Sequence, residues 1–330
     1  MSLRLLVLDA YDAAGREALR GAGATLAGEL SRRLLAALEP DATIDVVAHE
    51  ADGFTPPAPL TSYDGIAWTG SNLTIHRDTP AVRQQLDCAR AALAAGVPSF
   101  GSCWAVPIAV TAAGGRCEAN RRGREFGVAR TIALNDAGVA HPMFGGKPRA
   151  FDALTSHEDH VVELGLHAAL LASNDFAAVQ AVSVAYERGV FWATQYHPEY
   201  ALLDVARLGI LRAPQLIAQG DFADAAAAHA FLQQLEALHA DPSRRDLAYQ
   251  LGIGRDVLDA QVRSREARNW LDHLVKPHTA RRGRPWPARA WWANALRALR
   301  RRGDRPAGRD GPTPRGARGA TRNHRAQTRS

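Results

Sequence analysis

The stretch Ser99-Phe100-Gly101-Ser102-Cys103-Trp104-Ala105-Val106-Pro107 joins a short apolar segment to a helix-like one. A reactive side chain between a strand and a helix, with glycine two residues earlier, is typical of a nucleophile elbow. The tight turn pushes the side chain out of the sheet, and the helix N-terminus favours a thiolate. The pattern predicts that Cys103 is the nucleophile of an acyl-transfer enzyme; the alternative is a small buried core residue, as free cysteines often are.

The chain has three cysteines, which are too few and too scattered for a disulfide framework or a cysteine-based zinc site. We expect Cys88 and Cys117 to be packing residues, and the protein to reside in a reducing cytoplasm. Residues 1–10 turn acidic too early for a secretory signal and predict a first strand instead. No apolar run has the length of a transmembrane helix, so we expect no membrane contact.

The positive charge of the chain is concentrated near its end. The formal net charge is +6, whereas residues 276–330 carry 16 Lys and Arg against two Asp, a net of +14. Subtracting +14 from +6 leaves −8 for residues 1–275. The bulk of the chain is therefore mildly acidic, and Arg, Gly, Pro and Thr dominate a tail over 276–330 that we predict to be disordered.

Apolar segments rich in β-branched residues alternate with helical patterns along the chain. We expect strands over 3–8, 44–48, 65–69 and 97–100, and helices over 13–38 and 79–95. This alternation predicts an α/β fold with a mostly parallel central sheet flanked by helices. Further strands are expected over 127–134, 151–155, 178–186 and 190–195, followed by a helical region over 202–238 and a helical appendix over 241–275.

The predicted strand over 190–195 leads into Thr194-Gln195-Tyr196-His197-Pro198-Glu199-Tyr200. A thiol nucleophile needs a base to accept its proton and a group to orient that base. His197, stiffened by Pro198 and followed at i+2 by Glu199, suits such an imidazole–carboxylate pair. Sites of this kind lie at the carboxyl ends of strands in doubly wound folds. The alternative is a surface turn that contains His and Glu.

The elbow together with Gln-Tyr-His-Pro-Glu, in which His197 comes 94 residues after Cys103, resembles the class I glutamine amidotransferase family. Trp68-Thr69-Gly70-Ser71 lies where that family has the glycine turn of its oxyanion hole. Ser156-His157-Glu158-Asp159 resembles a stretch in the amidotransferase domain of GMP synthase, and residues 120–127 resemble a run in small stand-alone members. The resemblance covers roughly residues 1–240 and implies a flavodoxin-like amidotransferase domain there.

The resemblance also implies a mechanism. Cys103 would attack the side-chain amide of glutamine, His197 would carry the proton to the leaving ammonia, and Glu199 would orient the imidazole. Backbone N–H groups of Gly70 and Trp104 would hold the oxyanion. Water would then release glutamate from the thioester, and this half-reaction requires neither a metal nor an organic cofactor.

The candidate substrate-binding residues in this comparison are Ser71, Pro107, Glu125, His157 and Asp159. Other roles stay open for three of them. Glu125 can equally be a pocket-wall or surface residue, and His157 and Asp159 can shape a loop near the site. The His157–Asp159 region has no standard zinc spacing, so we expect no metal site.

The chain departs twice from the family's usual Cys-x-Gly-x-Gln pattern. Ala105 replaces the glycine, and Pro107 replaces a glutamine that helps to bind substrate in the family. Pro107 falls in the first helical turn, where its missing N–H costs little. We therefore expect thioester chemistry to be possible, with glutamine bound weakly or replaced by another γ-glutamyl compound.

Three functional alternatives follow. Residues 241–330 are too few for an ATP-pyrophosphatase and contain no glycine-rich phosphate loop, so ammonia would pass to a separate synthetase subunit. A stand-alone γ-glutamyl amide hydrolase is equally compatible. The last alternative is a non-catalytic regulatory or DNA-binding relative, in which residues 246–258 form a helix-turn-helix beside the Arg-rich tail. Asp256 and Asp259 would repel phosphates, so nucleic acid is not the expected partner.

Overall fold

The computed structural model describes residues 2–281, and within them nine strands form one mixed sheet in the order β2-β1-β3-β4-β11-β10-β9-β6-β7. The strands of this sheet are β1 Arg4–Asp9, β2 Thr43–Ala48, β3 Gly65–Trp68, β4 Ser99–Ser102, β6 Glu125–Leu134, β7 Ala150–His157, β9 Ala168–Ser173, β10 Ala181–Tyr186 and β11 Gly189–Thr194. A second, two-stranded sheet pairs β5 Arg116–Ala119 with β8 Asp159–Glu163.

Helices connect the strands and cover both faces of the sheet. They are α1 Ala13–Gly21, α2 Ala27–Leu38, α3 Pro80–Ala95, α4 Ala105–Ala112, α5 Asp136–Ala140, α6 Leu202–Ala218, α7 Ala225–Ala240, α8 Arg245–Leu251, α9 Arg255–Leu258, α10 Ala260–Arg263, α11 Arg265–Trp270 and α12 Lys276–Thr279. A π-helical turn, η3 Leu271–Val275, joins α11 to α12, and two 3₁₀ turns are η1 Leu60–Ser62 and η2 Pro142–Phe144.

The large sheet has a parallel half and an antiparallel half. Strands β2, β1, β3, β4 and β11 pair in parallel, and Thr194 at the end of β11 lies opposite Ser102 at the end of β4. Strands β10, β9, β6 and β7 continue the sheet with antiparallel pairs. The predicted α/β fold with a helix-flanked parallel sheet is confirmed, and the β-rich middle section builds the antiparallel edge.

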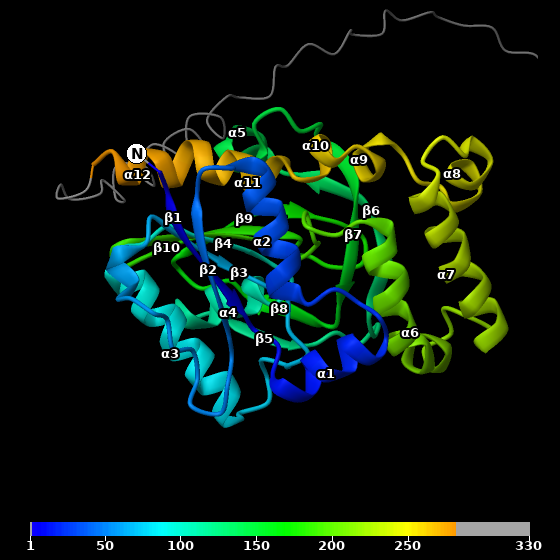
Figure 1. Ribbon diagram of the computed structural model, residues 1–330, viewed down its shortest axis with the longest axis horizontal. Helices are drawn as coiled ribbons and strands as arrows, with labels where there is room; N and C mark the ends of the chain where they lie inside the picture. The colour runs from blue at the N-terminus through cyan, green and yellow to red at the C-terminus, as the bar shows by residue number, and fades with distance from the viewer. Residues whose placement is uncertain (1, 282–330) are drawn as a thin grey trace, which may run out of the picture.

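The two faces of the sheet carry separate hydrophobic layers, as alternation along β1 requires. Leu6 and Leu8 pack with α3 and α4, whereas Leu5 and Val7 pack with α2 and the C-terminal helices. In Figure 1, α3 lies at the lower left, α10, α11 and α12 cross the top, and α6 and α7 stand at the right. Both apolar faces of the parallel strands are thereby removed from water.

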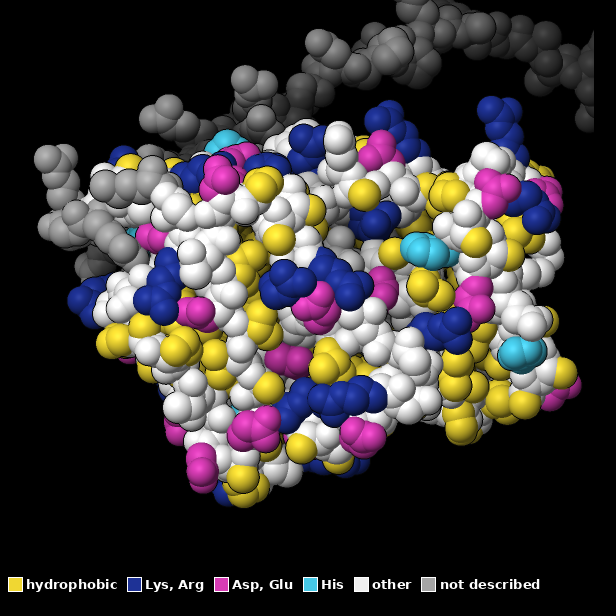
Figure 2. Space-filling view, in the orientation of Figure 1, with side chains coloured by type: hydrophobic (Ala, Val, Ile, Leu, Met, Phe, Trp, Pro, Cys, Tyr) yellow, Lys and Arg dark blue, Asp and Glu magenta, His cyan; other side chains and the backbone are white. Residues whose placement is uncertain are grey.

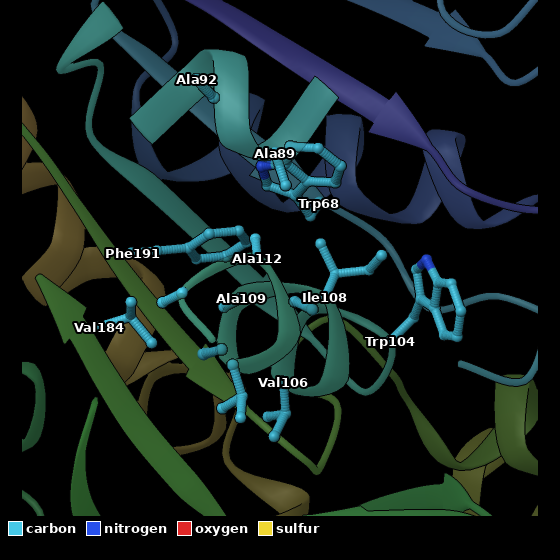
Figure 3. Packing of buried hydrophobic residues seen from close by; sticks show 14 of the residues in the cluster. Trp68, Ala89, Ala92, Trp104, Val106, Ile108, Ala109, Ala112, Val184 and Phe191 are labelled. Carbon is cyan, nitrogen blue, oxygen red and sulfur yellow. The ribbon is translucent and has the colours of Figure 1, made fainter. Parts of the chain in front are cut away.

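Helix α4 is buried on nearly all sides, which fixes the position of its N-terminus. Its residues are apolar throughout except Thr111, which is half-buried. Figure 3 shows Ile108, Ala109 and Ala112 of this helix beside the rings of Trp68 and Phe191, whose centroids are 5.7 Å apart. A helix that is hydrophobic all round belongs in the interior, so the elbow before α4 has a rigid support.

The segment after residue 240 packs into the body of the protein. Trp270 is fully buried and stacks on Phe100 with ring centroids 5.8 Å apart. Gly65 makes room for this ring, because a Cβ there would lie 2.7 Å from Trp270 Cζ2. The predicted helical appendix therefore contributes to the core, and the proposed division of the chain at residue 240 stays a prediction.

Several element boundaries differ from those expected, and the helical stretch over 13–38 is two helices, α1 and α2, separated by residues 22–26. Strand β4 runs two residues further than 97–100, so that it ends directly before Cys103. The helical region over 202–238 is two helices, α6 and α7, separated at Gly220, whose φ of 91° interrupts the helix. The predicted tail from 276 begins with helix α12, and its remainder, 282–330, lies outside the described residues.

The sequence that suggested a helix-turn-helix forms α8, a turn at Gly252 and the one-turn helix α9. Arg130 donates hydrogen bonds to the carbonyls of Leu251 and Gly252. The Asp256 carboxylate accepts the Asp152 N–H at 2.6 Å. This hairpin is thus fastened to β6 and β7 through the groups that its turn and second helix expose.

Among residues 2–281, no helix combines the length and the apolar character that a membrane span requires.

Candidate active site

Cys103 lies where β4 turns into α4, and its backbone is left-handed, with a φ of 52°. That conformation is uncommon for a residue with a side chain. The Cys103 N–H donates to the Thr194 carbonyl at 2.7 Å, which anchors the elbow to the end of β11. The thiol lies 3.4 Å from the Ser156 carbonyl oxygen and is largely buried.

Close packing beneath the elbow explains the glycine that precedes the nucleophile by two residues. A Cβ on Gly101 would overlap the Trp68 carbonyl oxygen and would lie 2.6 Å from the Ala105 Cβ. The Ala105 methyl therefore fills the space that Gly101 leaves free. This departure from the usual motif is accommodated in the core, away from the thiol.

His197 reaches the elbow because β11 lies beside β4. Its backbone N–H donates to the Leu154 carbonyl at 2.8 Å, and its ring stacks on Tyr200 at 3.8 Å with an interplanar angle of 4°. Its Nδ1 lies 2.7 Å from Glu199 Oε1, which also accepts the Ser102 hydroxyl at 2.7 Å. The ring is thereby oriented from both neighbouring strand ends.

The charge state of His197 follows from its surroundings. Burial alone would lower the pKa of the imidazole because it disfavours the charged ring. The Glu199 carboxylate outweighs this effect and, together with Cys103, raises the pKa of His197 to about 10. Ring Nε2 has no partner with hydrogen-bond geometry within the described part of the chain. Cys103 nevertheless lies near enough to the ring to contribute to its raised pKa. In contrast, burial raises the pKa of Cys88 and Cys117 to about 12, so neither thiol is ionised near neutral pH.

The predicted oxyanion residues flank the thiol. A Cβ on Gly70 would lie 3.0 Å from His197 Cε1 and 3.8 Å from Cys103 Sγ, so the turn after β3 lies directly against both groups. Neither the Gly70 N–H nor the Trp104 N–H donates to another group of residues 2–281. The Trp104 side chain turns elsewhere and donates from Nε1 to Gln85 Oε1 at 2.7 Å.

A cavity of about 300 Å³ opens beside Cys103, a size at the lower end of the range for small-molecule sites. Four of the five predicted substrate-binding residues line it, namely Ser71, Pro107, His157 and Asp159. The Ser71 hydroxyl donates to the Ala10 carbonyl at 2.7 Å. The Asp159 carboxylate accepts the Ile75 N–H at 2.8 Å and lies 3.1 Å from His76 Nδ1.

Glu125, the fifth candidate, does not line this cavity. Its carboxylate is held by His157 Nε2 at 2.8 Å, Gln180 Nε2 at 2.8 Å and Asn174 Nδ2 at 2.6 Å. Burial would raise the pKa of this carboxyl, but these partners, His157 foremost, keep it below its ordinary value. Glu125 therefore lies behind His157 as a partner of the cavity wall.

Further charged residues also line the cavity, among them Arg124 and Arg212. Neither Arg124 nor Arg212 is among the predicted substrate-binding residues. The sequence contained a signal, because Arg212 and Gln215 lie one helical turn apart in the largely apolar helix α6, and Gln219 is the C-cap of that helix. This pattern indicates a binding residue only if that side of α6 lines a cavity, and the sequence alone does not show where the helix packs.

No cluster of three or more His, Cys, Asp or Glu side chains in residues 2–281 is arranged to hold a metal ion.

Comparison with known proteins gives one family and several relatives. A family model described as glutamine amidotransferase class-I matches residues 36–204. A γ-glutamyl-L-1-hydroxyisopropylamide hydrolase of Pseudomonas sp. is 36% identical over 236 residues, which are 69% of this chain and 78% of that protein.

Two other curated relatives match over shorter spans. γ-Glutamyl peptidase 4 of Arabidopsis thaliana is 26% identical over 142 residues, covering 43% of this chain and about half, 55%, of that protein. A GMP synthase of Escherichia coli is 32% identical over 110 residues, covering 32% of this chain and 20% of that protein.

Among solved structures, a glutamine amidotransferase from Thermotoga maritima superposes with a TM-score of 0.57 at 15% identity, covering 84% of this chain and 99% of that one. One from Methylobacillus flagellatus gives a TM-score of 0.54 at 16% identity, covering 85% and 95%. These likenesses show a shared fold.

Proposed function

The chain belongs to the class-I glutamine amidotransferase family, and on that premise we propose that it hydrolyses γ-glutamyl amides through a thioester on Cys103. The observation that carries the proposal is the grouping of the Cys103 thiol, the His197 ring and the Glu199 carboxylate, with Cys103 lining a small cavity. The name of the Pseudomonas relative describes hydrolysis of the same bond type.

In the proposed mechanism, His197 Nε2 holds the proton taken from the thiol, and Cys103 Sγ attacks the amide carbon as a thiolate. Glu199 orients the ring through Nδ1 and stabilises its charged form. The backbone N–H groups of Gly70 and Trp104 hold the oxyanion, a role in which one donor is worth about 3 kcal/mol. The tetrahedral intermediate then breaks its C–N bond, and His197 protonates the departing amine.

Water completes the reaction. It attacks the thioester carbon while His197 accepts one of its protons, and the C–S bond breaks to release glutamate and the free thiol. One amide and one water thus yield glutamate and one amine, which is ammonia when the substrate is glutamine. The proposed steps use side chains, backbone N–H groups and water.

Pro107 bears on the choice of amide. It lines the cavity at the position where the family motif has glutamine, so no amide side chain from this position contacts the substrate. We therefore expect γ-glutamyl amides with an organic leaving group to be better substrates than glutamine.

A second candidate is ammonia supply to a separate synthetase. The similarity to GMP synthase supports it, although the matched region is only a fifth of that protein. Co-purification of a synthetase, together with glutamine hydrolysis that this partner stimulates, would favour it over stand-alone hydrolysis.

The decisive experiment measures glutamate release by the purified protein from γ-glutamyl-p-nitroanilide, a γ-glutamyl alkylamide and glutamine. Wild type should release glutamate, and hydroxylamine should trap the thioester as γ-glutamyl hydroxamate. Cys103→Ser should lose the activity, whereas Cys88→Ala, which removes another thiol, should retain it. Release that survives Cys103→Ser, or no release from any of the three amides, would contradict the proposal.

A further inference from the structure

Arg212 presents a positive charge to the cavity beside Cys103 without a counter-ion. It lies in α6 and lines the cavity. Its Nε is buried and makes no hydrogen bond, and no ion pair joins its guanidinium to any residue of the described range 2–281. A buried donor without a partner is costly, so this guanidinium is suited to an acceptor that comes from outside the chain.

Most other charged groups around the cavity are paired, and Arg77, whose side chain has no ion pair within residues 2–281, is exposed to solvent. Arg124 donates to Glu158 Oε2 at 2.8 Å, and Asp159 has the Ile75 N–H and His76. Among the lining residues of the described chain, the charge of Arg77 is therefore solvated, whereas Arg212 is a partly buried positive charge without an ion-pair partner. An anionic group entering the cavity would meet this charge in a partly dehydrated setting, where electrostatic attraction is strong.

Helix α6 places Arg212 on the same cavity as the reacting thiol. Gln215, one turn further on, accepts Arg124 Nε at 3.0 Å, and Gln219 bonds the Arg124 backbone through both its N–H and its carbonyl. Arg124 in turn reaches the Ser156 hydroxyl at 3.4 Å, and Ser156 contacts the thiol through its carbonyl. Both guanidinium groups line the same cavity, and burial together with the positive charge of Arg212 lowers the pKa of Arg124.

We propose that Arg212 binds the α-carboxylate of the γ-glutamyl group and thereby selects γ-glutamyl amides over amides without that carboxylate. The inference rests on the proposed function and adds a specificity residue to it. A γ-glutamyl group carries its carboxylate a few ångströms from the amide carbon, so both groups of one substrate can lie in the small cavity that Cys103 and Arg212 line. The guanidinium can hold a carboxylate with two parallel hydrogen bonds.

Three anilides separate this role from a structural one. γ-Glutamyl-p-nitroanilide has both the carboxylate and the amine, glutaryl-p-nitroanilide has only the carboxylate, and 4-aminobutyryl-p-nitroanilide has only the amine. The leaving group carries no carboxylate, so any effect of Arg212 concerns the acyl side. Arg212→Gln should lower kcat/KM for the two carboxylate-bearing substrates about 10- to 100-fold, mainly through KM. It should leave the 4-aminobutyryl substrate nearly unchanged, and Arg212→Lys should restore part of the loss.

Arg207→Gln is the matched control. Arg207 lies in the same helix, is paired with Glu236 at 3.4 Å and does not line the cavity. It should show wild-type discrimination among the anilides. An equal loss on all three substrates in Arg212→Gln would overturn the proposal, because a displaced helix would not distinguish the substrates.

A binding experiment makes the inference testable even if the protein proves not to hydrolyse amides. In the Cys103→Ser background, calorimetry should show glutaryl-p-nitroanilide binding at least tenfold tighter than 4-aminobutyryl-p-nitroanilide. Arg212→Gln in that background should abolish the difference. Failure of hydrolysis with this difference intact would refute the proposed function alone, whereas equal affinities before and after Arg212→Gln would refute the carboxylate site.

Discussion

Glu199 controls the proton on His197 from inside the protein. The side chain of Glu199 is 7% exposed and shares one oxygen between the imidazole and Ser102. Without this carboxylate, burial would be the dominant influence on the ring and would favour its neutral form. Glu199 thus orients the imidazole of His197 and also determines whether that imidazole is charged.

Glu199→Gln should therefore lower the pKa of His197 from about 10 to below its ordinary value of about 6.5. A pKa raised in the folded state stabilises the protein fully below the unfolded value, and this stabilisation is lost as pH rises through 10. The free energy of unfolding of wild type should thus fall between about pH 6.5 and pH 10, by at most about 1.4 kcal/mol per pH unit from this group. Glu199→Gln should lack this contribution.

Urea unfolding at several pH values and NMR titration of the His197 ring measure the two quantities independently. The same substitution should lower kcat by about 10³- to 10⁴-fold, by analogy with loss of the orienting carboxylate in other triads. An unchanged His197 titration in Glu199→Gln would show that another group holds the proton.

Most individual residues of the candidate site could be predicted from the sequence. Cys103, His197 and Glu199 stood in recognisable local patterns, and Gly70 was expected beside them; the structure brings all four together, while their catalytic roles stay predictions. Arg212 could not be found in this way, because a charge on a helix has meaning only once its counter-ions are known.

Helices of this protein do more than cover the sheet. Helix α6 supplies Arg212 to the cavity and holds the Arg124 segment through Gln215 and Gln219. Helix α11 carries Glu266, which is fully buried with Lys147 at 2.8 Å and accepts the Tyr196 hydroxyl at 2.5 Å. Since Tyr196 precedes His197, the C-terminal helices are fastened to the segment that bears the candidate base.

Trp270→Ala should reveal how strongly the C-terminal helices support the core. The indole is fully buried on Phe100, so its removal should cost about 3–5 kcal/mol in the free energy of unfolding. Tyr249→Ala is the control, because Tyr249 is 92% exposed in α8 and its loss should be nearly neutral. Chemical denaturation compares the two variants. Equal stabilities would mean that the segment after residue 240 is an appendix after all.

Elements with strong apolar periodicity were predictable, and the short or polar ones were not. Strands β5, β8 and β9 were missed, since β5 and β8 are short, charged and half-exposed, and β9 is the alanine-rich run AALLAS. The pairing of β5 with β8 depends on residues far apart in the chain. A local sequence pattern does not identify the strand with which a segment pairs.

The molecule as a whole divides its charges unevenly. Residues 1–275 carry a net charge of −8, and on the face in Figure 2 Lys and Arg side chains lie among Asp and Glu side chains without forming one basic patch. The excess of positive charge belongs to the residues from 276 onward. Any affinity of this protein for nucleic acid should therefore depend on that segment.

A chain ending at Arg281 should keep both its melting temperature and its hydrolysis of γ-glutamyl-p-nitroanilide. The core clusters and the cavity lining that the structure describes are built from residues 2–281. Calorimetry and steady-state kinetics test this, and salt-dependent DNA titration of the two forms tests the alternative function. A loss of hydrolysis on truncation would assign the removed residues a part in the site.

The stacking of Trp270 on Phe100 has a consequence for how this chain is made. The ring of Trp270 closes the core against strands that leave the ribosome some 170 residues earlier. During synthesis, one apolar face of strands β1, β3 and β4 stays exposed until the C-terminal helices leave the ribosome. Contacts of such long sequence separation form slowly. A nascent chain stalled before Trp270 should therefore be a target for chaperones, and one stalled well beyond Arg281 should not.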